Sequence, residues 1–231
     1  MKIDATTIHS GFIFLINNPN TLITLDANIL IPPDRSISTK SISFDTYKEI
    51  WLSPLFSSFT NIAIHESVYE ELVMSNIKNY VDSLISSTPP MIKILSDSSL
   101  LNTERFLRNT FEQKISFHTK YNPIIDNKDD RGEVKSLAYI AVKRLTYFAA
   151  HDSNAIQLIE KAELWSTGLD DLDAVKFYEI LYHLYKNNPG KSKGFKMLYK
   201  YLYYLTEKEH RENMEWGEFI LAMDLLYNQY Y

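Results

Sequence analysis

Four acidic residues at separate points of the chain have the chemistry to bind divalent cations together. Asp26 ends the apolar stretch TLITLD and Asp152 ends the stretch TYFAAHD, while Glu71 and Glu133 lie in segments with helical periodicity. Carboxylates gathered at one point repel one another and cannot all stay ionised without a positive charge nearby. Because Mg²⁺ and Mn²⁺ prefer carboxylate and water oxygens, a cluster of these four side chains predicts a site for one of these ions.

The segments around these acids alternate between two kinds. Short apolar runs bounded by polar residues are typical of buried strands and occupy residues 21–26, 61–64, 146–152 and, as a further candidate, 91–95. Apolar residues at spacings of three and four predict helices over residues 66–85, 100–117 and 132–145. This alternation predicts an α/β fold with a mainly parallel central sheet.

Such a sheet brings the four acids to one edge. Ligands of open α/β sheets bind at the carboxyl ends of the strands, where Asp26 lies after the first strand. Asp152 lies at the same edge if its strand is parallel to the first. We expect Glu71, beside the apolar Leu72, and Glu133, near the start of its helix, to complete the cluster.

Several of these residues also have a purely structural interpretation. Asp26 has the position of a residue that begins a turn or caps a helix. Asp130 followed by Glu133 fits a capping box. Asp152 precedes a helix that it is able to cap, although Ser153 would serve equally well and would leave Asp152 free for another role.

The order of the motifs resembles that of the PIN-domain nucleases. The chain has Asp-x-Asn after its first strand in LDANIL, then the helical segments SVYEEL and GEVKSLAYIA, then a strand that ends in aspartate in FAAHDSNA. The resemblance covers about residues 21–185. It implies a three-layer α/β/α nuclease domain over residues 1–185, with Mg²⁺ or Mn²⁺ bound by the acidic quartet Asp26, Glu71, Glu133 and Asp152.

The same resemblance assigns supporting positions to Asn28, Asp130, Ser153 and Asn154, with Asn28 orienting Asp26 as a hydrogen-bond donor. Two parts of the chain depart from the family pattern. Residues 86–128 hold more material than a minimal PIN domain needs. Residues 186–231 match nothing in the family and are expected to be a C-terminal helical extension packed on the domain.

The chemistry implied by the quartet is phosphodiester hydrolysis. Two cations roughly 3.5 to 4 Å apart activate a water and stabilise both the attacking and the leaving oxygen. The predicted function is a metal-dependent endoribonuclease that acts on single-stranded or structured RNA, with DNA left open as a substrate. The alternative is a non-catalytic PIN-like nucleic-acid-binding or scaffold protein. A haloacid-dehalogenase-like phosphatase is disfavoured because it needs a second aspartate where Asn28 stands.

A lysine-rich stretch near the C-terminus offers a surface for nucleic acid. Residues 186–200 contain five lysines and no acidic residue. If residues 195–205 form a helix, Lys196, Lys200 and Tyr203 share a face, away from the apolar face of Phe195, Leu198, Leu202 and Leu205. Lysine for phosphate and tyrosine for base stacking suit single-stranded nucleic acid. The alternative is a solvated lysine face over buried tyrosines.

Composition limits the compartment and the partners. The chain has no cysteine and no apolar run of about 20 residues, the length of a membrane span. The stretch GFIFLI is too short for a span and lacks the basic flank of a signal peptide, so we expect a cytoplasmic protein without a membrane segment. The net charge of -5 permits only a local basic surface. The sequence leaves open an antitoxin-type or other protein partner and a homodimer.

Overall fold

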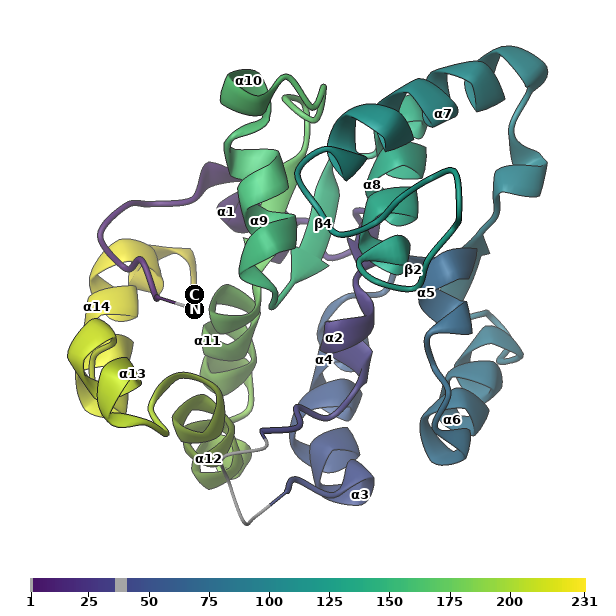
Figure 1. Ribbon diagram of the computed structural model, residues 1–231. Coiled ribbons are helices and arrows are strands. Elements are labelled where there is room, and N and C mark those ends of the chain that lie inside the picture. Colours follow the sequence, from purple (N-terminus) through teal and green to yellow (C-terminus); the bar gives the residue numbers. More distant parts are fainter. Residues whose placement is uncertain (1, 36–40) are drawn as a thin grey trace. The chain divides into compact units, whose positions relative to one another are not determined.

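The computed structural model describes residues 2–35 and 41–231 and shows an α/β fold (Figure 1). The strands of these ranges form one sheet in the order β3-β2-β1-β4-β5. They are β1 (Ile23–Leu25), β2 (Ile62–His65), β3 (Ile92–Leu95), β4 (Tyr147–Ala150) and β5 (Asp173–Lys176). The sheet is all-parallel and flanked by helices, which confirms the predicted fold class and is consistent with a three-layer α/β/α arrangement.

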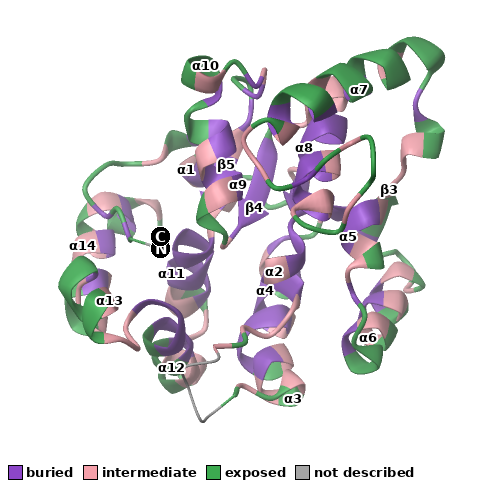
Figure 2. Cartoon of the chain, viewed as in Figure 1, coloured by how far each residue is buried: buried purple, intermediate pink, exposed green. Residues whose placement is uncertain are grey.

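The pairing of the strands aligns their carboxyl ends. In the central strand, Ile23 is paired with Ile62 of β2 and with Tyr147 of β4, and β2 continues the parallel register into β3. Strands β1, β2 and β4 are buried at every position, as Figure 2 shows for β4. Continuous apolar runs are typical of parallel strands that are buried on both faces. The residues that follow these strands therefore lie at one edge of the sheet.

The chain divides into two compact units. One, here called the sheet unit, comprises Leu22–Ile31 and Thr60–Val175. It contains all of the sheet except Lys176, the last residue of β5. Its helices are α2 (Ala27–Leu30), α5 (Glu66–Glu70), α6 (Ser75–Ile85), the 3₁₀ turn η2 (Asp97–Ser99), α7 (Asn102–Ser116), α8 (Arg131–Lys143), α9 (Ser153–Glu160) and α10 (Ala162–Trp165).

The second unit, here called the helical unit, comprises Met1–Thr21, Pro32–Phe59 and Lys176–Tyr231. Its helices are α1 (Ser10–Asn17), α3 (Phe44–Tyr47), the π-helical turn η1 (Lys48–Leu52), α4 (Ser53–Ser58), α11 (Phe177–Asn187), the turn η3 (Pro189–Lys191), α12 (Ser192–Tyr203), α13 (Glu207–Glu212), α14 (Trp216–Tyr227) and the turn η4 (Asn228–Tyr230). In the described parts of both units, no helix has both the length and the apolar composition needed to traverse a bilayer.

An aromatic core holds the helical unit together. The rings of Trp51 and Phe177 stack with centroids 3.8 Å apart, which joins the η1 segment to α11. Tyr199 of α12 stacks on Phe219 of α14 with centroids 4.7 Å apart. Helices from residues 176–231 therefore share one core with segments from the N-terminal quarter of the chain.

The helix predicted over residues 66–85 is interrupted, so that prediction is wrong in its middle. Helix α5 ends at Glu70 and α6 begins at Ser75, with Val73 in the connecting turn at 85% exposure. The backbone N–H of Val73 donates to the carbonyl oxygen of Glu71 at 2.8 Å, which closes the turn. At this break the Glu71 carboxylate accepts a hydrogen bond from the start of α8, a tertiary contact that helical periodicity does not reveal.

Candidate functional site

Asp26 lies at the carboxyl edge of the central strand. It follows β1 directly and is 6% exposed. Its backbone N–H donates to the carbonyl oxygen of Ala149 at 2.9 Å, which places it between the ends of β1 and β4. Its side chain makes no capping bond to α2, although it precedes that helix. The amide Nδ2 of Asn28 donates to the Asp26 carboxylate, so the predicted contact between these two residues is present.

Asn28 also links Asp26 to the second acidic strand end. Its Oδ1 accepts a hydrogen bond from the backbone N–H of His151 at 2.8 Å. One amide side chain thus joins the end of β1 to the residue before Asp152. This contact fixes the Asp26 carboxylate relative to the start of α9.

Asp152 caps a helix, a role that the sequence pattern allowed equally to Ser153. It is the N-cap of α9, and its Oδ1 accepts from the backbone N–H of Asn154 at 2.6 Å. Of the two caps that the sequence left open, Asp152 is the one present, and Ser153 is already the first helical residue. Aspartate and serine are almost equally good N-caps, so composition alone does not choose between them. The second carboxylate oxygen of Asp152 makes no hydrogen bond within the described residues.

Glu133 is tied to the same segment through Asn154. It lies in the first turn of α8 and is 8% exposed. The Nδ2 of Asn154 donates to Glu133 Oε1 at 3.0 Å, while the backbone N–H of Asn154 serves Asp152. Asn154 therefore connects two of the predicted ligands, which fits its predicted supporting position. Ser153 is exposed, and no hydrogen bond of its hydroxyl occurs among the described residues.

Glu71 caps helix α8 from another element. Its Oε1 accepts from the backbone N–H of Gly132 at 2.8 Å. A Cβ on Gly132 would stand 2.2 Å from that oxygen, so only glycine permits this approach. The first N–H groups of a helix have no partner within the helix, which makes them a ready site for a carboxylate. One oxygen of Glu71 thus has a structural function.

Asp130 does not form the capping box with Glu133 that the sequence allowed. Its backbone is left-handed, with φ of 55°, and its side chain makes no capping bond to α8. Its Oδ2 instead accepts from the backbone N–H of Lys120 at 2.8 Å and closes the loop before α8. Glu71 takes over the capping role, because a left-handed residue at the N-cap does not direct its own side chain at the helix start.

The electrostatics of this edge reflect burial and mutual repulsion. Burial, followed by the charges of Glu71 and Asp152, raises the pKa of Asp26 to about 7. Burial, followed by the charges of Asp26, Asp152 and Asp130, raises the pKa of Glu133 to about 9. Burial also raises the pKa of Glu71, against the Gly132 N–H and the Arg131 charge, which lower it. These carboxylates are close enough to disfavour simultaneous ionisation.

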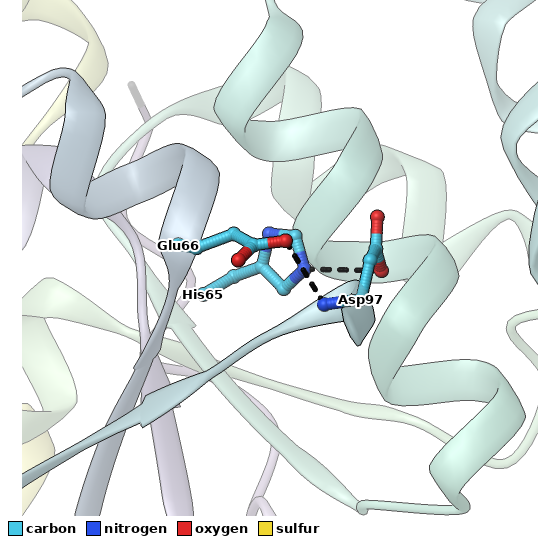
Figure 3. Close-up of side chains that lie close together, drawn as sticks. All are labelled: His65, Glu66 and Asp97. Atoms are coloured by element: carbon cyan, nitrogen blue, oxygen red, sulfur yellow. Dashed lines mark hydrogen bonds and ion pairs between the residues drawn. The ribbon is translucent and has the colours of Figure 1, made fainter. Parts of the chain in front are cut away.

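A second acidic cluster lies at the same edge, beyond β2 and β3 (Figure 3). His65, Glu66 and Asp97 bring one potential ligand atom each within 4.8 Å of one another. Among the described residues this is the one group of three that converges so closely, and no three members of the quartet do so. The position of these residues at the ends of β2 and β3 could have revealed them, as it revealed Asp26 and Asp152.

The second cluster is already compensated within the protein. Glu66 accepts hydrogen bonds from the Asp97 N–H at 2.9 Å and from the Ser96 hydroxyl at 2.5 Å. Asp97 forms an ion pair with Arg108, in which Oδ2 and Nη2 are 3.0 Å apart. The hydrogen bond with His65 and the charge of Arg108 together outweigh burial and lower the pKa of Asp97. The buried His65 ring also contacts the Ser67 hydroxyl at 2.7 Å. This arrangement joins the ends of β2 and β3 to α7.

The predicted nucleic-acid surface on α12 is only partly as expected. Lys196 and Lys200 are exposed on this helix. Tyr203 is completely buried, so its predicted place on the lysine face is wrong. Its ring lies against Tyr199, with centroids 5.6 Å apart, and against Tyr178 at 6.3 Å, so the ring belongs to the aromatic core of the helical unit. Leu205, expected to face inward from the helix, lies beyond its end at Tyr203.

Comparisons of this chain with models of protein families, with curated proteins and with solved structures find no match.

Proposed function

We propose that this protein is a metal-dependent endoribonuclease of the PIN type, in which Asp26, Glu133 and Asp152 hold Mg²⁺ or Mn²⁺. One observation carries the proposal. Among the described residues, none of these three carboxylates forms an ion pair with lysine or arginine, although Asp26 and Glu133 are buried. A buried carboxyl without a positive partner either stays protonated or is neutralised by a cation from solution, and the raised pKa values of Asp26 and Glu133 are those expected of ligands that a divalent cation would ionise. The His65 cluster differs because its Asp97 forms an ion pair with Arg108.

The donor chemistry fits such an ion. The groups at this edge are carboxylate oxygens, held by the amides of Asn28 and Asn154, and no thiol is present in the chain. Hard divalent cations select this donor set. A bound divalent cation supplies water activation and charge stabilisation for phosphodiester hydrolysis.

Neighbouring residues of the chain hold the carboxylate ligands in position. Asn28 holds Asp26 against the end of β4, and Asn154 holds Glu133 beside Asp152. Such outer contacts fix the orientation of ligands and are worth about 10- to 100-fold in metal affinity or activity. Glu71 contributes negative charge beside Asp26 while its Oε1 stays on the N-terminus of α8.

The test compares cleavage and metal binding in matched variants. Single-turnover cleavage of a labelled single-stranded RNA is measured with Mg²⁺, with Mn²⁺ and with a chelator, and a DNA strand of the same sequence is run in parallel. We expect cleavage that needs metal, that is lost in Asp26→Asn and that persists in Asp171→Asn, an exposed acid of the same unit. Calorimetric titration with Mn²⁺ should lose its signal in Asp26→Asn as well.

Two results would contradict the proposal. Cleavage that survives in Asp26→Asn or in chelator would exclude these carboxylates as the catalytic site. RNA binding without cleavage, and without a calorimetric response to Mn²⁺, would favour the non-catalytic alternative.

A further inference from the structure

An open groove of about 620 Å³ runs along the exposed side of α12 in the helical unit. Lys193, Lys196 and Lys200 line it together with the apolar side chains of Met197 and Leu205. A volume of this size is typical of ligand sites, which combine apolar walls with a few charged groups. The groove therefore suits a ligand that is both anionic and apolar.

The charge on this side of α12 is uncompensated. The three lysines are spaced by three and four residues, so they lie on one side of the helix over two turns, about 10 Å. Helix α12, with the sequence SKGFKMLYKYLY, contains no acidic residue. Within residues 2–35 and 41–231, none of the three ammonium groups forms an ion pair. The whole chain is acidic, so this local positive surface stands out and favours an anionic partner.

The aromatic rings of the groove are largely engaged within the protein. Tyr201 is 8% exposed, and its hydroxyl accepts from the backbone N–H of Arg35 at 3.2 Å. The Tyr204 ring is covered on one face by His210, with ring centroids 4.0 Å apart. Proteins that bind single-stranded nucleic acid stack bases on open aromatic faces. In this groove Tyr201 is buried, and Tyr204 is half-buried with one ring face taken by His210. The most exposed of its apolar side chains is Met197, which is 43% exposed, and Ile42 and Leu205 are half-buried beside it.

A flexible methionine surface packs well against aliphatic side chains of a partner. We propose that the groove along α12 is a docking site for an acidic amphipathic peptide segment of another protein. Aliphatic side chains of that segment pack against Met197 and Leu205, and its carboxylates pair with the three lysines. This is the mode in which an amphipathic helix lays its apolar face in a groove. The inference does not depend on the nuclease function.

A synthetic peptide tests the proposal directly. The probe is a fluorescently labelled helical peptide with leucines along one face and glutamates along both borders of that face, titrated with the full chain by anisotropy. A second peptide carries glutamine in place of each glutamate, and a labelled single-stranded RNA is the third probe. We expect the glutamate peptide to bind, with an affinity that falls as salt rises, and the glutamine peptide to bind at least tenfold more weakly.

Matched variants separate local contacts from net charge. Lys196→Glu with Lys200→Glu should weaken peptide binding at least tenfold. Lys128→Glu with Lys208→Glu changes the net charge equally at exposed lysines elsewhere and should have little effect. Met197→Gln should weaken binding of the peptide and leave any RNA binding unchanged. All these side chains are exposed, and thermal unfolding checks that each variant is folded.

Three outcomes would overturn the proposal. Equal binding of the glutamine peptide would show that charge pairing has no part. Equal peptide binding by the lysine double variant would place the binding site elsewhere. If the chain binds RNA but not the peptide, and the lysine double variant no longer binds RNA, the groove is a nucleic-acid site.

Discussion

The side chains of Asp26 and Glu133 set the chemical character of the sheet edge. Each is buried, each is oriented by an asparagine amide, and each has its pKa raised by burial and by neighbouring carboxylates. Without a cation, the folded protein keeps these groups protonated to a higher pH than the unfolded chain does. A carboxyl of this kind favours folding below its unfolded pKa, and the contribution is lost as pH rises through the folded value.

The first prediction follows from the direction of these shifts. In metal-free buffer, the variant Asp26→Asn with Glu133→Gln should match the parent near pH 3, below the unfolded pKa of about 4. It should become progressively more stable than the parent as pH rises from there towards the folded pKa values of about 7 and 9, with no further gain above them. For a chain of this size, a gain of ~1 kcal/mol raises Tm by roughly 2–4 °C. Thermal unfolding across this pH range measures the difference.

Divalent cations provide the control for this prediction. Mg²⁺ or Mn²⁺ should raise the Tm of the parent increasingly with pH, because metal ligands must be deprotonated, and should leave the double variant unchanged. A double variant that is much less stable than the parent at high pH without metal would instead show that both carboxylates serve packing.

At the scale of elements, helix α8 depends on a cap supplied from outside it. Asp130 is the N-cap residue of α8, but its side chain makes no capping bond. The Glu71 carboxylate, in the turn after α5, accepts from the Gly132 N–H instead. Two further contacts hold the same helix start through Arg131, the first residue of α8. Arg131 donates to Asp126 of the preceding loop at 3.0 Å and to Glu70 of α5 at 2.6 Å. The position of Glu133 therefore rests on contacts between α5, α8 and the preceding loop.

The second prediction tests this cap with a double-mutant cycle. Glu71→Ala should lower the free energy of unfolding by about 0.5–2 kcal/mol, the usual effect of removing a cap. Gly132→Ala should change it little, since the displaced cap is offset by the better helix propensity of alanine, about 1 kcal/mol. In the Gly132→Ala background, Glu71→Ala should then have almost no effect. Urea unfolding without metal measures all four proteins.

Glu163→Ala, an exposed acid in α10, is the control and should be additive with Gly132→Ala. Additive effects of Glu71→Ala and Gly132→Ala would contradict the cap. In that case the contact between the two residues would contribute nothing to stability.

At the scale of the whole molecule, the two units are built from interleaved parts of the chain. The helical unit takes residues from the start, from the region before β2 and from the end of the chain. Its fully buried side chains include Phe12, Trp51, Phe195, Tyr199 and Phe219, which come from all three parts. The C-terminal residues thus form core as well as surface.

The third prediction concerns removal of residues 186–231. A chain ending at residue 185 should lose the near-UV signal of packed aromatics and bind a hydrophobic dye, because rings such as Tyr178 would lose their neighbours Tyr203 and Phe219. Leu221→Gln with Leu225→Gln alters exposed positions in the same segment and should leave both signals unchanged. A shortened chain with native near-UV signal and Tm would support a separable extension.

The sequence by itself determined the parallel sheet and the place of Asp26. Both depend on local patterns: strands buried on both faces have continuous apolar runs, and the residue that follows such a strand must lie at the carboxyl edge. The contact of Asn28 with Asp26 was also predictable from local sequence, because the two residues are only two positions apart.

Only the tertiary structure decided which acids serve as caps and which tyrosine is buried. Glu71 meets Gly132 across 61 residues, and Asp97 meets Arg108 because the turn η2 comes against α7. Tyr203 was placed on the lysine face by its position relative to Lys196 and Lys200. In the structure it is fully buried, and the Tyr178 ring of α11 lies against it, a contact that periodicity within one helix does not reveal. Such roles depend on where separate elements meet, because burial and hydrogen bonding are set by neighbours in space.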